Sequence, residues 1–437
     1  MSSEWREISL KDAVGFIVDN RGRTAPAVEK GIPLIATNCV NNKDLYPQKL
    51  NLRYVSQDTY ETWFRAHPEP GDILLTNKGS QNGAVCLVPD PVDFCIAQDM
   101  VALRADPEKL YPLYLFAALR SDLVQGRMKA LNVDAVIPHL KKTDFDKLLI
   151  PLPDTETQHW VGDCYFQLSS RITLLRETNA TLEAIAQALF KSWFVDFDPV
   201  RAKAEGRQPE GMDASTAALF PDSFEESELG LVPKGWRCGE LADLADLNPE
   251  SWTAKRRPET VAYIDLANAK ENVIAEITDY PFDDAPSRAR RVLRDGDTIV
   301  GTVRPGNRSF AFIANAVENL TGSTGFAVLR PKCTENTEFV YLAATLDASI
   351  EHLTHVADGG AYPAVRPEVV AGLGTVLPAI QILMAFHEIA KPLFLRLAES
   401  HEQAQTLIQL RDTLLPRLIS GQLRLPDAEQ AVEEALA

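Results

Sequence analysis

Two short polar stretches carry the residue types best suited to bind a ligand, and each follows an apolar run that opens with glycine and aspartate. The runs are Gly-Asp-Ile-Leu-Leu-Thr at 71–76 and Gly-Asp-Thr-Ile-Val-Gly at 296–301. Amide, hydroxyl and basic side chains contact phosphate oxygens and hydrogen-bond to the edges of bases. The candidates are Asn77, Lys78, Ser80, Gln81 and Asn82 in the first loop, and Arg304, Asn307, Arg308 and Ser309 in the second. These loops predict contacts with nucleic acid.

Further basic and polar side chains widen this set of candidates. A turn-rich segment near the start offers Asn20, Arg21, Arg23 and Thr24, and the densest basic cluster is Arg288, Arg290, Arg291 and Arg294. Two later segments, Ile137-Pro138 after Asn132 and Tyr362-Pro363 after Gly359-Gly360, could supply additional contact loops. A charged, solvated surface is the plain alternative for any single one of these residues.

Residue patterns for catalysis or metal binding are missing from the sequence. There is no P-loop, no G-x-G-x-x-G, and no Asn-Pro-Pro-aromatic motif of the kind that grips a flipped base; the closest string is Asn248-Pro249-Glu250. His352 and His355 lack a partner at ligand spacing, and Asp196 with Asp198 fits a helix end. The six cysteines are scattered without a C-x-x-C pair. We therefore expect no catalytic site, no metal and no cofactor.

The chain repeats itself over a long period. Gly71-Asp72 recurs as Gly296-Asp297, 225 positions later, and 151–153 lies opposite 376–378 at the same offset. The dipeptide Trp5-Arg6 also recurs, as Trp236-Arg237. A nearly constant offset indicates duplication of one domain. Each copy is a mixed stretch of short strands and turns followed by a long helix.

Two long heptad patterns predict the helices. The first begins near Asp154 or Thr155, where Thr155 and Gln158 have capping-box spacing. Apolar residues then recur every seven positions, which is typical of a coiled-coil seam. The seam residues include Leu168, Leu175, Leu182, Leu189, Leu393, Leu407 and Leu414. We expect the two helices to bury these seams on each other as an antiparallel coiled coil whose length acts as a ruler. Trp193, Phe194 and Phe197, if exposed, would mark a partner-binding surface.

The fold expectation is an α+β protein with two α/β recognition domains in tandem, separated by the two helices. The boundaries are 1–153 for the first recognition domain, 154–197 for the first helix, 198–233 for an irregular linker, 234–378 for the second recognition domain, 379–425 for the second helix and 426–437 for a frayed tail. The net charge is −17, and nearly half of the acidic excess falls in 151–233, mostly outside the recognition domains. No stretch of 18 apolar residues occurs and the start is not signal-like, so we expect a cytoplasmic protein without a membrane span.

At the helices the sequence resembles the specificity subunits of type I restriction-modification systems. The string LEAIAQALFKSWFVDFDPV (182–200) is similar to their central conserved region, and LIQLRDTLLPRLISGQLRL (407–425) to their C-terminal one. One departure is that the second helix opens with Ala379-Ile380-Gln381, without the acidic residue found in Glu156-Thr157-Gln158. The resemblance implies two target-recognition domains that each read half of a bipartite, asymmetric site in double-stranded DNA. It also implies docking of two methyltransferase subunits and of restriction/translocase subunits, with no active site on this chain.

Two other classes of function compete with this interpretation. A stand-alone DNA methyltransferase would need the missing cofactor and base-gripping motifs. A coiled-coil interaction protein that does not bind DNA would not need duplicated polar loops. Incubating the chain alone with DNA and a methyl donor tests the first alternative.

Overall fold

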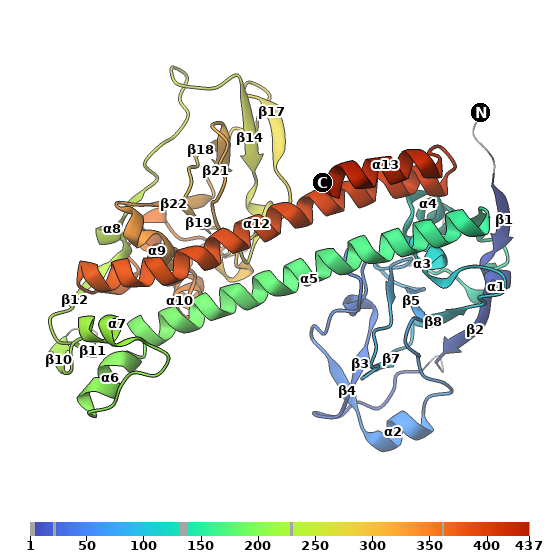
Figure 1. Ribbon diagram of the computed structural model, residues 1–437, viewed down its shortest axis with the longest axis horizontal. Coiled ribbons are helices and arrows are strands. Elements are labelled where there is room, and N and C mark those ends of the chain that lie inside the picture. Colours follow the sequence, from blue (N-terminus) through green and yellow to red (C-terminus); the bar gives the residue numbers. More distant parts are fainter. Residues whose placement is uncertain (1–4, 21–22, 132–137, 228–229, 361, 437) are drawn as a thin grey trace. The chain divides into compact units, whose positions relative to one another are not determined.

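The computed structural model describes residues 5–20, 23–131, 138–227, 230–360 and 362–436. The chain divides into unit 1, made of residues 1–177 and 402–437, and unit 2, made of residues 178–401. Two helices of 40 residues, α5 (Thr155–Phe194) and α12 (Ile380–Ile419), contribute residues to both units (Figure 1). The division therefore cuts each helix near its middle, whereas the sequence predicted boundaries at the helix starts.

Unit 1 contains short strands and helices that precede α5. They are β1 (Arg6–Ser9), α1 (Leu10–Ala13), β2 (Val14–Asp19), β3 (Ile32–Ile35), β4 (Arg53–Val55), α2 (Gln57–Thr62), β5 (Ile73–Thr76), β6 (Val85–Leu87), β7 (Cys95–Ile96), β8 (Met100–Ala105), α3 (Pro112–Arg120), α4 (Asp122–Ala130), β9 (Leu149–Leu152) and, after α12, α13 (Leu425–Leu436). Helices α3 and α4 lie beside the first turns of α5 (Figure 1). The core joins α3 and the sheet to α5 and α12, with Tyr114, Phe116 and Phe145 buried among them.

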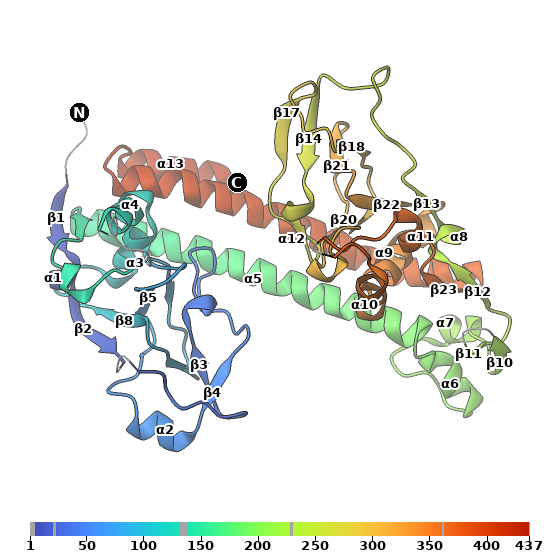
Figure 2. The same cartoon turned by 180° about the vertical axis from the view of Figure 1, so that it is seen from behind.

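Unit 2 contains the remaining elements. They are α6 (Asp198–Ala204), α7 (Ala214–Leu219), β10 (Phe224–Ser227), β11 (Gly230–Pro233), β12 (Arg237–Glu240), α8 (Leu241–Leu244), β13 (Ala245–Leu247), β14 (Thr260–Ile264), β15 (Ala269–Lys270), β16 (Val273–Ile274), β17 (Thr278–Pro281), β18 (Ala289–Val292), β19 (Thr298–Gly301), β20 (Phe310–Phe312), β21 (Leu320–Ser323), β22 (Phe326–Pro331), α9 (Thr337–Thr345), α10 (Asp347–Val356), α11 (Pro367–Ala371) and β23 (Gly374–Leu377). Figure 2 shows α9, α10 and α11 gathered beside β20 and β22.

The two units repeat one strand order. In unit 1 the sheet runs β2-β8-β5-β6, and in unit 2 it runs β13-β22-β19-β20. The antiparallel pair β1–β9 has its counterpart in β12–β23, and the parallel pair β3–β7 in β14–β21. The repeat seen in the sequence is thus a repeat of topology, built on different side chains.

The glycine–aspartate pair has the same physical role in both units. Gly71 and Gly296 adopt φ of 84° and 82°, a left-handed turn that favours glycine. Asp72 is buried and accepts two hydrogen bonds from Arg104, at 2.9 and 3.0 Å. Asp297 accepts the same two bonds from Arg330, both at 2.8 Å. These bonds raise the pKa of both guanidinium groups and tie the start of β5 or β19 to the neighbouring strand.

The helix α5 packs against α12 within each unit. In unit 1, Leu168, Leu175 and Leu407 are buried together, and Leu414 is buried further along α12. In unit 2, Leu182, Leu189 and Leu393 pack on the core that contains Phe386 and Phe394. Asn179 donates to the carbonyl of Leu397, whereas the ring of Trp193 lies 5.8 Å from that of Phe386. The residue numbers therefore run in opposite directions along the two helices.

The start of α5 differs from the expected capping box. Asp154, rather than Thr155, caps the helix, because its Oδ1 accepts from the backbone N–H of Thr157 at 2.8 Å. The side chain of Gln158 instead accepts from the backbone N–H of Tyr111 at 3.1 Å, just before α3. Gln158 thus joins the two helices instead of closing a cap.

The expected irregular linker and frayed tail are both ordered. Residues 198–233 form α6, α7 and the hairpin β10–β11, and they bury Val200, Phe220 and Val232 in the core of unit 2. Asp213 caps α7 by accepting from two backbone N–H groups. In the tail, α13 buries Ala428 in the core of unit 1. Proline and glycine content signalled turns correctly, but the apolar residues between them had enough area to anchor short helices.

Candidate nucleic-acid interface

In unit 1 the polar loop predicted from the sequence connects β5 to β6 and lies against a second loop. We call residues 77–84 the hairpin loop of unit 1 and residues 138–140 its return loop. The backbone N–H of Leu140 donates to Asn77 O at 2.9 Å, and that of Gly79 donates to Pro138 O at 3.1 Å. Lys78 and His139 form an isolated β-bridge between these two bonds. The two loops thus form one edge, which we call the paired-loop edge.

Unit 2 has the same paired-loop edge. Its hairpin loop, residues 302–309, connects β19 to β20, and its return loop is 363–365. The N–H of Val365 donates to Thr302 O at 2.9 Å, and that of Arg304 donates to Pro363 O at 2.7 Å. Val303 and Ala364 form the bridge. All three pairings recur at an offset of 225 residues, so one backbone frame presents two different sets of side chains.

Two positions of the hairpin loop adopt the left-handed conformation in both units. Unit 1 has glycine at both, Gly79 with φ of 94° and Gly83 with φ of 89°. Unit 2 has arginine at both, Arg304 with φ of 49° and Arg308 with φ of 59°. The structural counterpart of Arg304 is therefore Gly79, not Lys78 as the sequence comparison suggested. An arginine costs more than a glycine in this conformation.

The candidate residues of unit 1 divide into exposed and buried ones. Ser80, Gln81, Arg23 and Thr24 are exposed, and Lys78 is partly exposed and ion-pairs with Asp99 at 3.7 Å. The segment before Arg23 and Thr24 is tied near the return loop, because Asp19 ion-pairs with Lys142. Arg21, Asn132 and Ile137 lie outside the described residues.

Asn20 and Asn77 are not available for contacts as predicted. Both are 8% exposed; Asn20 donates to Ile96 O, and the backbone of Asn77 holds Asp99 and Leu140. Their amides serve the local structure because the strands that end beside them must satisfy backbone groups away from water. A short polar loop in a sequence does not reveal which of its side chains turn inward.

The arginines of unit 2 are mostly engaged by partners within the unit. Arg308 ion-pairs with Asp347 at 2.8 Å and with Glu271 at 2.9 Å. In the other cluster, each guanidinium meets a group distant in sequence: Arg288 bonds to Asp265 and Tyr263, Arg290 stacks on Phe282, Arg291 bonds to Ser251, and Arg294 bonds to Glu250. The cluster is thus largely neutralised rather than an open basic patch. Asn307 and Arg304 are exposed.

Within that cluster Arg288 is the residue that backbone bonds place closest to the paired-loop edge. Thr324 N donates to Arg288 O at 2.8 Å, and the next residue, Gly325, accepts from Thr302 N at 2.8 Å. The guanidinium of Arg288 is more than half exposed despite its ion pair.

The aromatic residues proposed as a partner surface are buried. Trp193, Phe194 and Phe197 are 3%, 4% and 8% exposed. Phe194 lies 5.0 Å from Phe386 and 5.9 Å from Trp236, ring centre to ring centre. The expectation of an exposed patch is therefore wrong, because 198–233 folds back over the end of α5 and covers it. The nearby Asp196 and Asp198 bond to Lys191 and Ser192.

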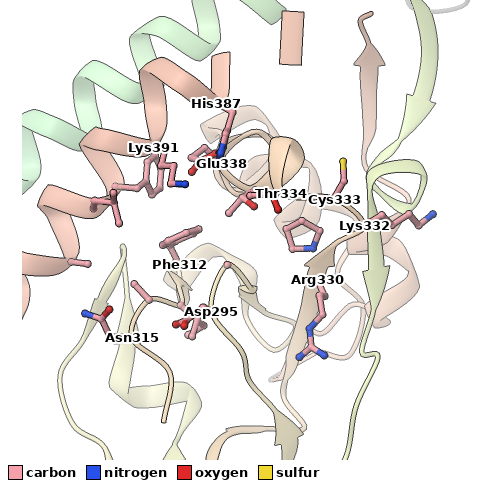
Figure 3. Close-up of a pocket in the computed structure, with 18 residues that line it drawn as sticks. Asp295, Phe312, Asn315, Arg330, Lys332, Cys333, Thr334, Glu338, His387 and Lys391 are labelled. Carbon is pink, nitrogen blue, oxygen red and sulfur yellow. The ribbon is translucent and has the colours of Figure 1, made fainter. Parts of the chain in front are cut away.

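Unit 2 also contains an open pocket of about 550 Å³ between α12 and the strands β20 and β22 (Figure 3). His387 and Glu338 point toward each other there, with 2.5 Å between Nδ1 and Oε2. In unit 1 the position of His387 is occupied by Gly162, where a Cβ would lie 2.6 Å from Tyr114 N. Close packing on a glycine thus fills in unit 1 what remains open in unit 2.

Neither the pocket nor the rest of the described chain offers a metal site. Among the described residues, no group of three or more His, Cys, Asp or Glu side chains is placed to hold a metal ion. Within those same residues, no helix is long and apolar enough to cross a membrane.

Comparison with known proteins places this geometry in a family. The model of the type I restriction modification DNA specificity domain matches residues 2–184. The HindI specificity subunit of Haemophilus influenzae is 25% identical over 96% of this chain and all of its own length. The MjaIX specificity subunit of Methanocaldococcus jannaschii is 21% identical over 82% of this chain and 78% of its own length. A crystal structure of a type I S subunit from M. genitalium shares the fold, with a TM-score of 0.57 at 16% identity over 95% of this chain and 96% of that one.

These similarities define the chain first as a DNA target-recognition protein of a restriction-modification system. More particularly, they indicate a type I specificity subunit, as the helix motifs suggested.

Proposed function

We propose that this chain is the non-catalytic subunit that reads a bipartite, asymmetric target in double-stranded DNA for a type I complex. Each unit acts as one target-recognition domain and reads one half of the target. The observation that carries the proposal is the paired-loop edge, which has the same backbone bonds in both units and different side chains. A fixed frame with variable side chains suits a protein that must position two readers alike and give them different sequences to read.

The exposed groups on each edge have the chemistry that this role needs. Lys78, Ser80 and Gln81 in unit 1 and Arg304 and Asn307 in unit 2 are donors and acceptors for phosphate oxygens and base edges. The net charge of −17 does not oppose this, because a local basic group can bind phosphate whatever the total charge. Arg23 and Thr24 in unit 1 and Arg288 in unit 2 flank the two edges and would supply further phosphate contacts.

We propose that α5 and α12 form one antiparallel coiled coil that docks two methyltransferase subunits and the restriction/translocase subunits. The opposed numbering of their contacts within each unit supports the antiparallel arrangement. Since Trp193 and its neighbours are buried, the docking surface must lie elsewhere. Met384, Ile389 and Leu395 on the unit 2 part of α12 are 45%, 44% and 55% exposed, and they are the best candidates.

The methylated sequence of the assembled complex tests the assignment of one half-site to each unit. The full chain is expressed with its methyltransferase subunit, and methylated positions are mapped by sequencing. Lys78→Ala should weaken or relax recognition in one half-site and Asn307→Ala in the other, each by about 1–3 kcal/mol if a base contact is lost. Relaxation of the same half-site by both variants would exclude the assignment.

The absence of an active site is tested with the chain alone. Purified chain with DNA and a methyl donor should transfer no methyl groups, and sequence-specific transfer should begin only when the methyltransferase subunit is added. Methylation by the chain alone would overturn the proposal in favour of a stand-alone methyltransferase.

A further inference from the structure

Arg304 occupies an unfavourable backbone conformation at the tip of the paired-loop edge of unit 2. Its φ and ψ are 49° and 63°, the left-handed region. This region penalises side chains other than those of glycine, asparagine and aspartate, and unit 1 places Gly79 at the same point. A long side chain kept where glycine would be easier points to a role for that side chain.

The surroundings fix the position of Arg304. Its N–H donates to Pro363 O at 2.7 Å, and the preceding residue, Val303, pairs with Ala364. The next residue, Pro305, is buried and has a ring that restricts φ. The Cζ of Arg304 lies 4.6 Å from the centre of the Tyr362 ring, and Tyr362 is 70% exposed. The guanidinium is thus supported on an aromatic plane that stands at the surface.

This arrangement differs from that of the second left-handed arginine. Arg308 stacks on Phe310 at 5.4 Å, but its N–H groups face Asp347 and Glu271. Those two carboxylates occupy the guanidinium fork that would otherwise read a base. Arg304 is exposed and its described stacking partner is a neutral ring, which takes up a face of the guanidinium and not its edge.

We propose that Arg304 reads a guanine in the half-site bound by unit 2, with Tyr362 as the platform that orients it. Arginine forms two parallel hydrogen bonds to O6 and N7 of guanine in the major groove, and a pre-oriented planar group loses little freedom on forming them. Because Gly79 has no side chain, unit 1 makes no such contact at the corresponding point. The inference rests on the proposed function and names the base that one of its two edges recognises.

The test uses the full chain assembled with its methyltransferase subunit, and the readout is the methylated sequence. Arg304→Gly is the variant of choice because Gly79 shows that glycine suits this backbone, and the thermal midpoint should be no lower than that of the parent. We expect one guanine position in one half-site to accept other bases, with discrimination falling by about 10- to 100-fold. The remaining positions of both half-sites should not change.

Two further variants separate base reading from simpler roles. Arg304→Lys keeps the charge and loses the planar fork, so it should lose most of the guanine discrimination. If Arg304 bound only phosphate, Lys would restore function and Gly would weaken all sequences alike, which would overturn the inference. Tyr362→Phe keeps the ring and should leave the guanine requirement intact, whereas Tyr362→Leu should relax it.

Other outcomes overturn either the inference or the proposed function, and they can be told apart. An unchanged motif in Arg304→Gly, or relaxation at a base pair without guanine, contradicts the guanine contact and leaves the two-domain assignment standing. Changes in both half-sites, or a parent complex with no defined motif, contradict the proposed function itself.

Discussion

Gly162 in α5 is the point where the structure predicts an unusual effect of a conservative change. Replacing glycine with alanine inside a helix normally stabilises a protein by up to about 1 kcal/mol. At Gly162, however, the new Cβ would lie 2.6 Å from Tyr114 N and 2.9 Å from Leu113 C. Both are backbone atoms of the first turn of α3, so no side-chain rotation relieves the overlap. Overpacking of this kind costs about 1–3 kcal/mol, which leaves a net loss of roughly 1–2 kcal/mol.

Gly126→Ala supplies a matched control in α4. A Cβ there meets no atom within 4 Å, so only the gain in helix propensity remains. In thermal unfolding of the full chain followed by circular dichroism, Gly162→Ala should lower the midpoint of unit 1 by about 2–8 °C, at roughly 2–4 °C per kcal/mol. Gly126→Ala should raise it. If both variants raise the midpoint alike, α3 does not rest on Gly162 and our description of this packing is wrong.

The contact matters for function because α3 links α5 to the recognition edge. Arg120, the last residue of α3, donates to the carbonyl of Val85 at 2.7 Å from Nη2, and Val85 directly follows the hairpin loop of unit 1. The guanidinium also bonds to Asn41 O and Asp44 O, and it is nearly buried. The helix that packs on α5 therefore positions the loop that we propose reads DNA.

Three further predictions follow from buried or paired groups in unit 2. Asp297→Ala leaves Arg330 without its buried partner and should destabilise the unit by about 3–5 kcal/mol, seen as an earlier urea transition; a change below 1 kcal/mol would contradict the role of the glycine–aspartate pair. Trp193→Ala should cost about 3–5 kcal/mol of stability, as expected for a core residue; normal stability with loss of methyltransferase binding would restore the partner-surface interpretation. Arg308→Gly should leave the methylated motif unchanged, because its fork already faces Asp347 and Glu271; a relaxed guanine position would show that Arg308, not Arg304, reads the base.

Local sequence patterns predicted the elements that position the site. The offset of 225 residues and the glycine–aspartate turns located the strands β5 and β19, because a left-handed turn before a buried strand has few solutions. The heptads located α5 and α12 to within a residue or two at their starts. Both signals depend on neighbours in the sequence or on strict periodicity, which a single sequence displays.

Long-range partners could not be predicted in the same way. The pairing of Arg288 with Asp265 and of Arg308 with Asp347 depends on how strands and helices meet, and nothing in the composition of a loop signals it. The burial of Trp193 depends on the fold of 198–233, which was expected to be irregular. One signal was available and unused: at an offset of 225 residues, Gly79 lies opposite Arg304, so the conformation of the arginine could have been inferred from its repeat.

The central claim is that each unit reads its own half-site through its paired-loop edge, and a loop exchange tests it most directly. Residues 77–84 replace 302–309, which have the same length and the same backbone bonds to the return loop. The measurement is the methylated motif of the complex that contains the exchanged chain. We predict that one half-site changes its sequence while the other keeps every base. A motif that is unchanged, or altered in both halves, would contradict the account.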